Sequence, residues 1–225
     1  GYLVIGTIVS AWLASQGRRA GLLLPLFAAT LVVTFSRGAW LAALAGILAF
    51  LVVARVRDIT VAPRVARLVA VSVLAVVITV VAFRQPIFTR FDATARLEEK
   101  SVSERLSEFP AWPDVIRQNV FTGVGTGNYT VALAILFPGR DVWAYQPVHN
   151  AFLLFLAETG ILGLLVAARM VQALLTYFRT KHARLLPALP LFAALLVLAL
   201  FDHYLWSLWP GMSLLVVTGA IAIKA

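Results

Sequence analysis

The sequence has 225 residues, of which 61% are hydrophobic and 13% are charged, and its formal net charge is +9. Its mean hydropathy of +0.92 is far above that of soluble domains, in which about half of the residues are apolar, so the composition excludes an ordinary soluble domain and indicates a membrane protein. The chain has no cysteine, which excludes disulfides, thiolate metal sites and cysteine nucleophiles.

Seven apolar stretches are predicted to be membrane-spanning helices. A span needs about 20 mostly apolar residues, because the hydrocarbon core is about 30 Å thick and a helix rises about 1.5 Å per residue. The fold class is therefore predicted to be all-α, a polytopic transmembrane helix bundle of about seven spans. The stretches are residues 1–15, 20–35, 38–54, 68–83, 149–178, 185–201 and 210–223.

The first stretch begins at Gly1 with no initiator Met, basic region or cleavage site, so it is not predicted to be a signal peptide. We expect the chain to begin inside a longer protein. Residues 1–225 are then predicted to form a single membrane domain, as a fragment of that larger protein.

Basic residues gather at alternate ends of the predicted spans. One set of ends carries ten Lys or Arg residues against Asp58 alone, whereas the opposite set carries eight basic and eight acidic residues. Since Lys and Arg accumulate in short cytoplasmic loops, the first set is predicted to be cytoplasmic, together with the C-terminus. Residues 84–148 then form one large external, periplasmic loop. This topology explains the whole basic excess, so no nucleic-acid partner is predicted.

Arg37 lies in TFSRGAW, in the middle of a long apolar run, so the chain must reverse there and hold a guanidinium at the outer interface. The side chain could be an anchor that reaches lipid headgroups. It could instead bind an anion, because a guanidinium presents a fork of donors matched to phosphate oxygens.

The external loop is predicted to form short amphipathic helices on the membrane surface, since apolar and charged residues recur at helical spacing in FDATARLEEKSVSERLSEFPAWPDVIRQ. It continues through NVFTGVGTGNYTVA, in which Gly123, Gly125 and Gly127 suit a tight turn. The glycines lack the GxxxxGK[ST] spacing of a nucleotide-binding loop, which favours a structural turn.

His149 opens the fifth predicted span, HNAFLLFLAETGILG, at the boundary between the external loop and the membrane. An imidazole there can take up a proton near neutral pH, although a helix cap or a headgroup contact is the alternative. Glu158 stands nine residues further on and points to the opposite helix face. Its region is predicted to be structural, with Gly160 and Gly163 packing against another helix.

The external turn FDHYLWSLWPG follows the sixth predicted span. Its residues Trp206 and Trp209 are typical of an aromatic belt at a membrane interface. The second-rank candidates for a site are Asp202 and His203 in this turn, and Tyr145 and Asn150 near His149.

Four segments, TFSRGAW, SERLSEFPAWPDVIRQNVFTGVGTGNY, VHNAFLLFLAETGILGLL and FDHYLWSLWPG, resemble the O-antigen ligase and polymerase superfamily in that order. The resemblance implies the C-terminal catalytic half of a membrane glycosyltransferase. Such enzymes transfer a glycan from an undecaprenyl-diphosphate carrier to a sugar hydroxyl, such as one of lipid A-core, at the outer face of the inner membrane. They use external arginines and one histidine, with no metal, nucleotide sugar or other cofactor. By resemblance these residues are Arg37, Arg105 and His149.

Arg105 is selected by the resemblance, because it stands four residues before Phe109 and eighteen before Gly123. Arg37 and Arg105 would bind the diphosphate and stabilise it as it leaves, while His149 would be the general base for the acceptor hydroxyl. No second carboxylate for a covalent intermediate is evident in the loop, so the reaction is expected to invert the anomeric centre.

Several alternatives remain at the level of the sequence. Within the superfamily, the chain could be a repeat-unit polymerase or a protein O-oligosaccharyltransferase. A transporter or flippase would gather its polar residues at the membrane midplane, whereas here they gather at the outer interface. In a non-catalytic membrane scaffold, Arg37, Arg105 and His149 would be interfacial anchors only.

Overall fold

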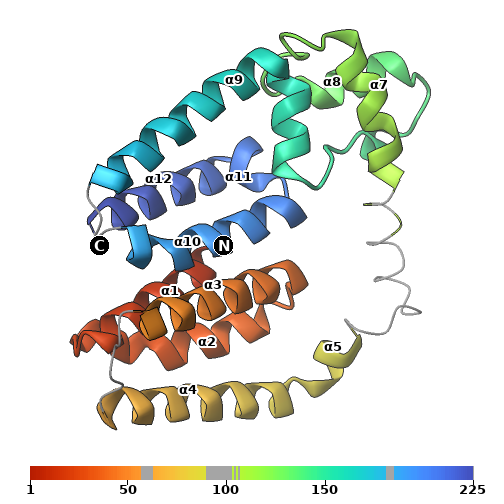
Figure 1. Cartoon of the computed structure of the whole chain (residues 1–225). Helices are drawn as coiled ribbons and strands as arrows, with labels where there is room; N and C mark the ends of the chain where they lie inside the picture. Colours follow the sequence, from red (N-terminus) through yellow and green to blue (C-terminus); the bar gives the residue numbers. More distant parts are fainter. Residues whose placement is uncertain (57–62, 90–102, 104, 106, 181–184, 225) are drawn as a thin grey trace. The chain divides into compact units, whose positions relative to one another are not determined.

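The structure is a computed structural model that describes residues 1–56, 63–89, 103, 105, 107–180 and 185–224. Every regular element in these residues is a helix, so the predicted all-α class is confirmed (Figure 1). The chain divides into two compact units. Unit 1 holds Gly1–Glu98, Ala183–Leu198 and Leu214–Ala225, and unit 2 holds Glu99–His182 and Ala199–Ser213.

Unit 1 is a bundle of apolar helices in which α1 contacts α2, α3 and α4. Many large side chains of α4 point outward, including Val73 at 57% and Ile78 at 58% exposed, as expected of a helix that faces lipid. The helices formed before residue 90 are α1 (Tyr2–Ser15), the 3-10 helix η1 (Arg19–Leu23), α2 (Leu24–Val33), α3 (Arg37–Val56), α4 (Pro63–Ala82) and α5 (Arg84–Thr89).

A tight turn between α2 and α3 positions Arg37, and this confirms the predicted chain reversal. Phe35 adopts a positive φ of 51°, and the Ser36 hydroxyl accepts a hydrogen bond from the Ala39 backbone N–H at 3.3 Å. Ser36 is therefore the N-cap of α3, and Arg37 is its first residue. The Trp40 indole N–H donates to the Leu31 carbonyl at 3.0 Å, which ties α3 to the end of α2.

All seven predicted apolar stretches coincide with helices in the structure. Within the described residues, three of these helices are long and apolar enough to cross a membrane, namely Arg37–Val56, Val65–Ala82 and Ala151–Thr180. The shorter apolar helices are Tyr2–Ser15, Arg19–Val33, Ala188–Phe201 and Trp209–Ile223. The structure thus has helices suited to a membrane, and the count of about seven spans stays a prediction.

Unit 2 contains the short helices of the predicted external loop, gathered around the beginning of α9 (Figure 1). Its core includes Val115, Tyr129, Val148 and Leu154, each no more than 1% exposed. The elements are η2 (Phe109–Ala111), α7 (Trp112–Gln118), α8 (Tyr129–Leu136), η3 (Val142–Ala144), α9 (Ala151–Thr180) and α11 (Tyr204–Ser207). The helices α10 (Leu185–Phe201) and α12 (Trp209–Lys224) each pass from one unit into the other.

The predicted apolar stretch 149–178 forms α9, which is long and apolar enough to cross a membrane, but the helix is broken at Gly160 (φ 63°, ψ −165°) and bends there (Figure 1). The segment 120–125 inserts beside the break and replaces the helical hydrogen bonds that are lost. Two carbonyls and two N–H groups of α9 are thereby satisfied from outside the helix. The four bonds are Val124 N to Ala157 O (3.0 Å), Gly125 N to Glu158 O (2.9 Å), Ile161 N to Val120 O (3.0 Å) and Leu162 N to Phe121 O (3.0 Å).

The inserted segment needs glycine on both sides of the contact. Gly123 has a φ of 69°, and a Cβ there would collide with the backbone of Glu158; a Cβ on Gly160 would collide with the backbone of Phe121. The prediction of a structural glycine turn is confirmed. The predicted helix-packing role of Gly160 is wrong, since this residue breaks the helix instead.

Candidate functional site

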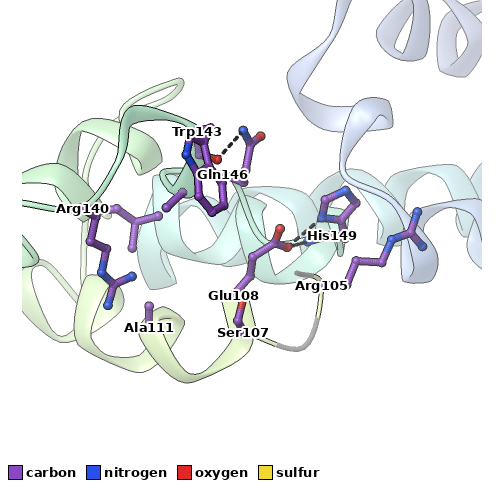
Figure 2. A pocket seen from close by; sticks show the side chains of 10 residues that line it. Arg105, Ser107, Glu108, Ala111, Arg140, Trp143, Gln146 and His149 are labelled. Carbon is purple, nitrogen blue, oxygen red and sulfur yellow. Dashed lines mark hydrogen bonds and ion pairs between the residues drawn. The ribbon is translucent and has the colours of Figure 1, made fainter. Parts of the chain in front are cut away.

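A pocket of about 640 Å³ opens within unit 2 (Figure 2). It includes two of the predicted site residues, Arg105 and His149. The described residues that line it all fall between positions 105 and 149, in the predicted external loop and at its end. They are Arg105, Ser107, Glu108, Ala111, Leu133, Arg140, Trp143, Ala144, Gln146 and His149.

A carboxylate and an imidazole meet in this pocket. The Glu108 Oε2 atom accepts hydrogen bonds from Nδ1 of His149 at 2.7 Å and from the His149 backbone N–H at 3.2 Å (Figure 2). The Glu108 side chain is 7% exposed and the His149 side chain 25%. An ionised carboxylate can only accept, so this contact favours Nδ1 as the donor, and in the tautomer that carries its proton there Nε2 keeps its lone pair.

Packing between α7 and α9 holds the two partners in place. The Trp112 indole N–H donates to the Leu153 carbonyl at 2.7 Å, which joins the start of α7, just after Glu108, to the first turn of α9. The Asn150 carboxamide Oδ1 accepts from the backbone N–H groups of Phe152 and Leu153, both at 3.0 Å. The N-cap of α9 is therefore Asn150, and His149 is not required for that role.

Two guanidinium groups line the pocket on opposite sides of the Glu108–His149 pair, Arg105 on one side and Arg140 on the other (Figure 2). The Arg140 guanidinium lies 4.2 Å from the centre of the Phe137 ring. Among the described residues, neither arginine forms an ion pair. Arg37 begins α3 in unit 1, so its convergence on this pocket stays a prediction.

The second-rank candidate His203 lies beside His149, with the ring centres 5.2 Å apart. Its Nδ1 atom lies 2.7 Å from the hydroxyl oxygen of the exposed Ser207. Burial lowers the pKa of His203 from its ordinary value, and the nearby Asp202 opposes this shift. The Asp202 carboxylate accepts from the His203 backbone N–H at 2.8 Å, so it orders the turn before α11.

The remaining second-rank candidate is Tyr145. Its hydroxyl donates to the Phe137 carbonyl at 2.9 Å and accepts from the Arg140 backbone N–H at 3.1 Å. This arrangement shapes the loop that carries Arg140. Tyr129 lies deeper, with a fully buried hydroxyl that has no hydrogen-bond partner within the described part of the chain. Burial, followed by the negative charge of Glu108, raises the pKa of Tyr129.

Glu158 is a buried structural carboxylate rather than a partner of His149. It is 4% exposed and accepts a hydrogen bond from the Trp206 indole N–H at 2.7 Å. Trp206 also packs edge-on against Phe155, with the ring centres 4.8 Å apart. Trp206 is thus half-buried, whereas Trp209 is 81% exposed, and the aromatic belt that the two residues were expected to form stays a prediction.

Sequence reasoning missed the other described lining residues, among them Glu108, Arg140, Trp143 and Gln146. Glu108 lies 41 residues before His149, and no local pattern connects the two. Arg140 was visible only as one charge in an electrically balanced loop. The run GRDVWAYQPVHN, which places a basic, an aromatic and an amide residue shortly before His149, was the available signal.

Comparison with known proteins identifies a family. A family model described as O-Antigen ligase matches residues 20–168, which is more than half of the chain. The matched segment includes Arg37, Arg105, Glu108 and His149. No curated protein and no solved structure matches the chain.

Proposed function

Because the chain belongs to the O-antigen ligase family, we propose that it transfers a glycan from an undecaprenyl-diphosphate carrier to a hydroxyl of a sugar acceptor such as lipid A-core. The family indicates O-antigen ligase or polymerase-type activity and a membrane glycosyltransferase-like enzyme. The observation that carries the proposal is the 2.7 Å contact between His149 and Glu108 in a pocket that Arg105 also lines.

His149 acts as the general base. Its Nε2 lone pair accepts the proton of the acceptor hydroxyl as the hydroxyl oxygen attacks the anomeric carbon of the donor glycan. The bond between that carbon and the diphosphate oxygen breaks, and its electron pair leaves with the diphosphate. Glu108 holds the imidazole in one tautomer and stabilises the positive charge that the ring acquires.

Arg105 and Arg37 bind the departing diphosphate. A diphosphate is already a stable anion, so fixed positive charge is enough to assist its departure and no acid is needed to protonate it. A guanidinium fork suits phosphate oxygens better than the point charge of lysine does. Direct attack by the acceptor inverts the anomeric centre, in keeping with Glu108 as the one carboxylate among the described residues that line the pocket.

The site lies on the periplasmic face of the inner membrane in this proposal. Residues 1–225 form one multi-pass membrane domain of about seven spans, with the C-terminus in the cytoplasm and residues 84–148 outside. The distribution of Lys and Arg along the sequence supports this orientation. The lipid-linked donor then reaches the pocket from the bilayer, and no nucleic acid takes part.

The test is glycan transfer in vitro by the complete protein in lipid nanodiscs, from a purified undecaprenyl-diphosphate-linked glycan. Lipid A-core, a second lipid-linked repeat unit and a Ser/Thr peptide are offered as acceptors in separate reactions. We expect transfer to lipid A-core, loss of transfer in His149→Ala and Arg105→Lys, and retention in the control Arg117→Lys, an exposed residue paired with Asp114. Transfer to the repeat unit alone would make the enzyme a polymerase, and full activity of His149→Ala would overturn the mechanism.

A further inference from the structure

The proposed chemistry leaves one end of the pocket without a role. That end is formed by Arg140, Trp143 and Gln146, and it lies on the side of the Glu108–His149 pair away from Arg105 (Figure 2). The Trp143 side chain is 63% exposed although it lines the pocket. A large aromatic surface left open in a concave site is a common feature of ligand recognition.

The three side chains match the two kinds of surface that a sugar ring presents. A pyranose has C–H faces that pack against an aromatic ring, and hydroxyl edges that need hydrogen-bond partners. Trp143 supplies the indole, and the neighbouring Gln146 supplies a carboxamide. The Gln146 Nε2 atom donates to the Trp143 backbone carbonyl at 3.1 Å, which holds the amide beside the indole and leaves its oxygen able to accept.

Arg140 adds a charge requirement to this end of the pocket. Its guanidinium carbon lies 4.2 Å from the centre of the Phe137 ring, and among the described residues its N–H donors have no acceptor, so they remain for a ligand. Among the described residues it has no acidic partner, and the acid that lines the pocket, Glu108, is engaged by His149. A carboxylate or phosphate on the sugar would satisfy the guanidinium edge.

We propose that Arg140, Trp143 and Gln146 form a subsite for an acidic pyranose, which is the acceptor sugar of the transfer reaction. The assignment to the acceptor rests on the proposed function. In a direct displacement the attacking oxygen and the leaving diphosphate lie on opposite sides of the anomeric carbon. Arg105 and Arg140 lie on opposite sides of His149, so one serves the leaving group and the other serves the attacking sugar.

Direct binding tests the subsite separately from catalysis. Saturation-transfer NMR is recorded on the complete protein in nanodiscs with methyl glucuronide and, in parallel, with methyl glucoside. We expect the wild type to favour the glucuronide at least about tenfold. Trp143→Ala should abolish binding of both sugars, and Arg140→Gln should remove the preference for the acid. The controls are Trp209→Ala, an indole 81% exposed outside the pocket, and Arg117→Gln, and both should bind as the wild type does.

Equal binding of the two sugars by the wild type, or unchanged binding in both pocket variants, would overturn the subsite. A loss of lipid-linked donor binding in Arg140→Gln, with glucuronide binding intact, would overturn it in favour of a second diphosphate contact. The proposed function fails separately: if the subsite binds glucuronide as expected but no donor supports transfer to any acceptor, the subsite stands and the transferase assignment does not.

Discussion

At His149, one carboxylate decides which ring nitrogen can accept a proton. Glu108 is almost completely buried and accepts two hydrogen bonds from the same residue, one from the ring and one from the backbone. The backbone bond fixes the position of Glu108 relative to the chain at His149, and the ring bond then fixes the imidazole. Orientation of the base by a third group is a general requirement of such sites.

We predict that Glu108→Gln lowers kcat by about 10²- to 10⁴-fold, because a neutral amide cannot stabilise the imidazolium or enforce the tautomer. KM for the lipid-linked donor should stay unchanged, since Arg105 and Arg37 are intact. Steady-state transfer kinetics measure both constants. The control is Asp114→Asn, which removes one partner of the exposed ion pair between Asp114 and Arg117 in α7. An unchanged kcat would show that Glu108 does not position the base.

The half-buried His203 predicts a pH dependence of stability. Burial lowers its pKa below the ordinary 6.5, so the folded protein favours the neutral ring. Below about pH 6.5 the unfolded chain then binds more protons than the folded one, and stability falls as the pH drops toward the lowered pKa. His203→Gln cannot titrate and should show a weaker fall in unfolding midpoint between about pH 8 and 5. Identical pH profiles for the variant and the wild type would contradict this prediction.

At the scale of elements, the break in α9 connects the glycine turn to the site. The segment 120–125 forms four backbone hydrogen bonds with the helix, and Val124 packs against the core that also holds Val148. Trp206 reaches Glu158, the residue two positions before the break. The short first part of α9, which begins directly after the His149–Asn150 pair, is therefore held by contacts on several sides.

We predict that Gly160→Ala and Gly123→Ala each destabilise the protein by about 1–3 kcal/mol or more, since both combine a positive φ with a backbone collision. Gly139→Ala is the matched control, with a φ of 88° but open space around its Cβ position, so it carries the conformational cost alone. In thermal unfolding in nanodiscs, the unfolding midpoints of Gly160→Ala and Gly123→Ala should lie well below that of Gly139→Ala. Equal midpoints for all three would mean that the close contact is unimportant.

The sequence predicted elements better than it predicted their irregularities. Apolar composition determines where helices form in a membrane protein, so all seven stretches are helical. The break at Gly160 depends on a loop about 40 residues earlier, and its backbone partners leave no periodic signal. The same contrast holds for the residues of the site. His149 and Arg105 were predicted through motif resemblance, whereas Glu108 and Arg140 become recognisable only when the fold brings them to the pocket.

At the scale of the whole molecule, the uneven distribution of Lys and Arg predicts the orientation of the chain in the membrane. The predicted cytoplasmic ends hold ten basic residues against one acidic residue, and the opposite ends are balanced. Moving this many Lys and Arg residues across the bilayer is strongly disfavoured. Of the two opposite orientations of the chain, the one that keeps these residues in the cytoplasm therefore inserts more readily. The described pocket residues all belong to the balanced set of ends, so in the proposed orientation the pocket faces the periplasm.

Labelling of single introduced cysteines should distinguish the two orientations. Residues 1–225 contain no cysteine, so they contribute no labelling signal other than that of the introduced residue. We predict that Gln118→Cys in α7 reacts with a membrane-impermeant thiol reagent in spheroplasts, whereas Thr180→Cys at the end of α9 reacts only after the membrane is permeabilised. Both positions are exposed, so accessibility to solvent on each side, rather than burial in the protein, controls the result. The two positions bracket the broken helix, and the 20 residues from Ile161 to Thr180 suffice to cross about 30 Å of hydrocarbon. Equal labelling in intact spheroplasts would place both ends of α9 on one side and would exclude it as a span, even though its length and composition permit one.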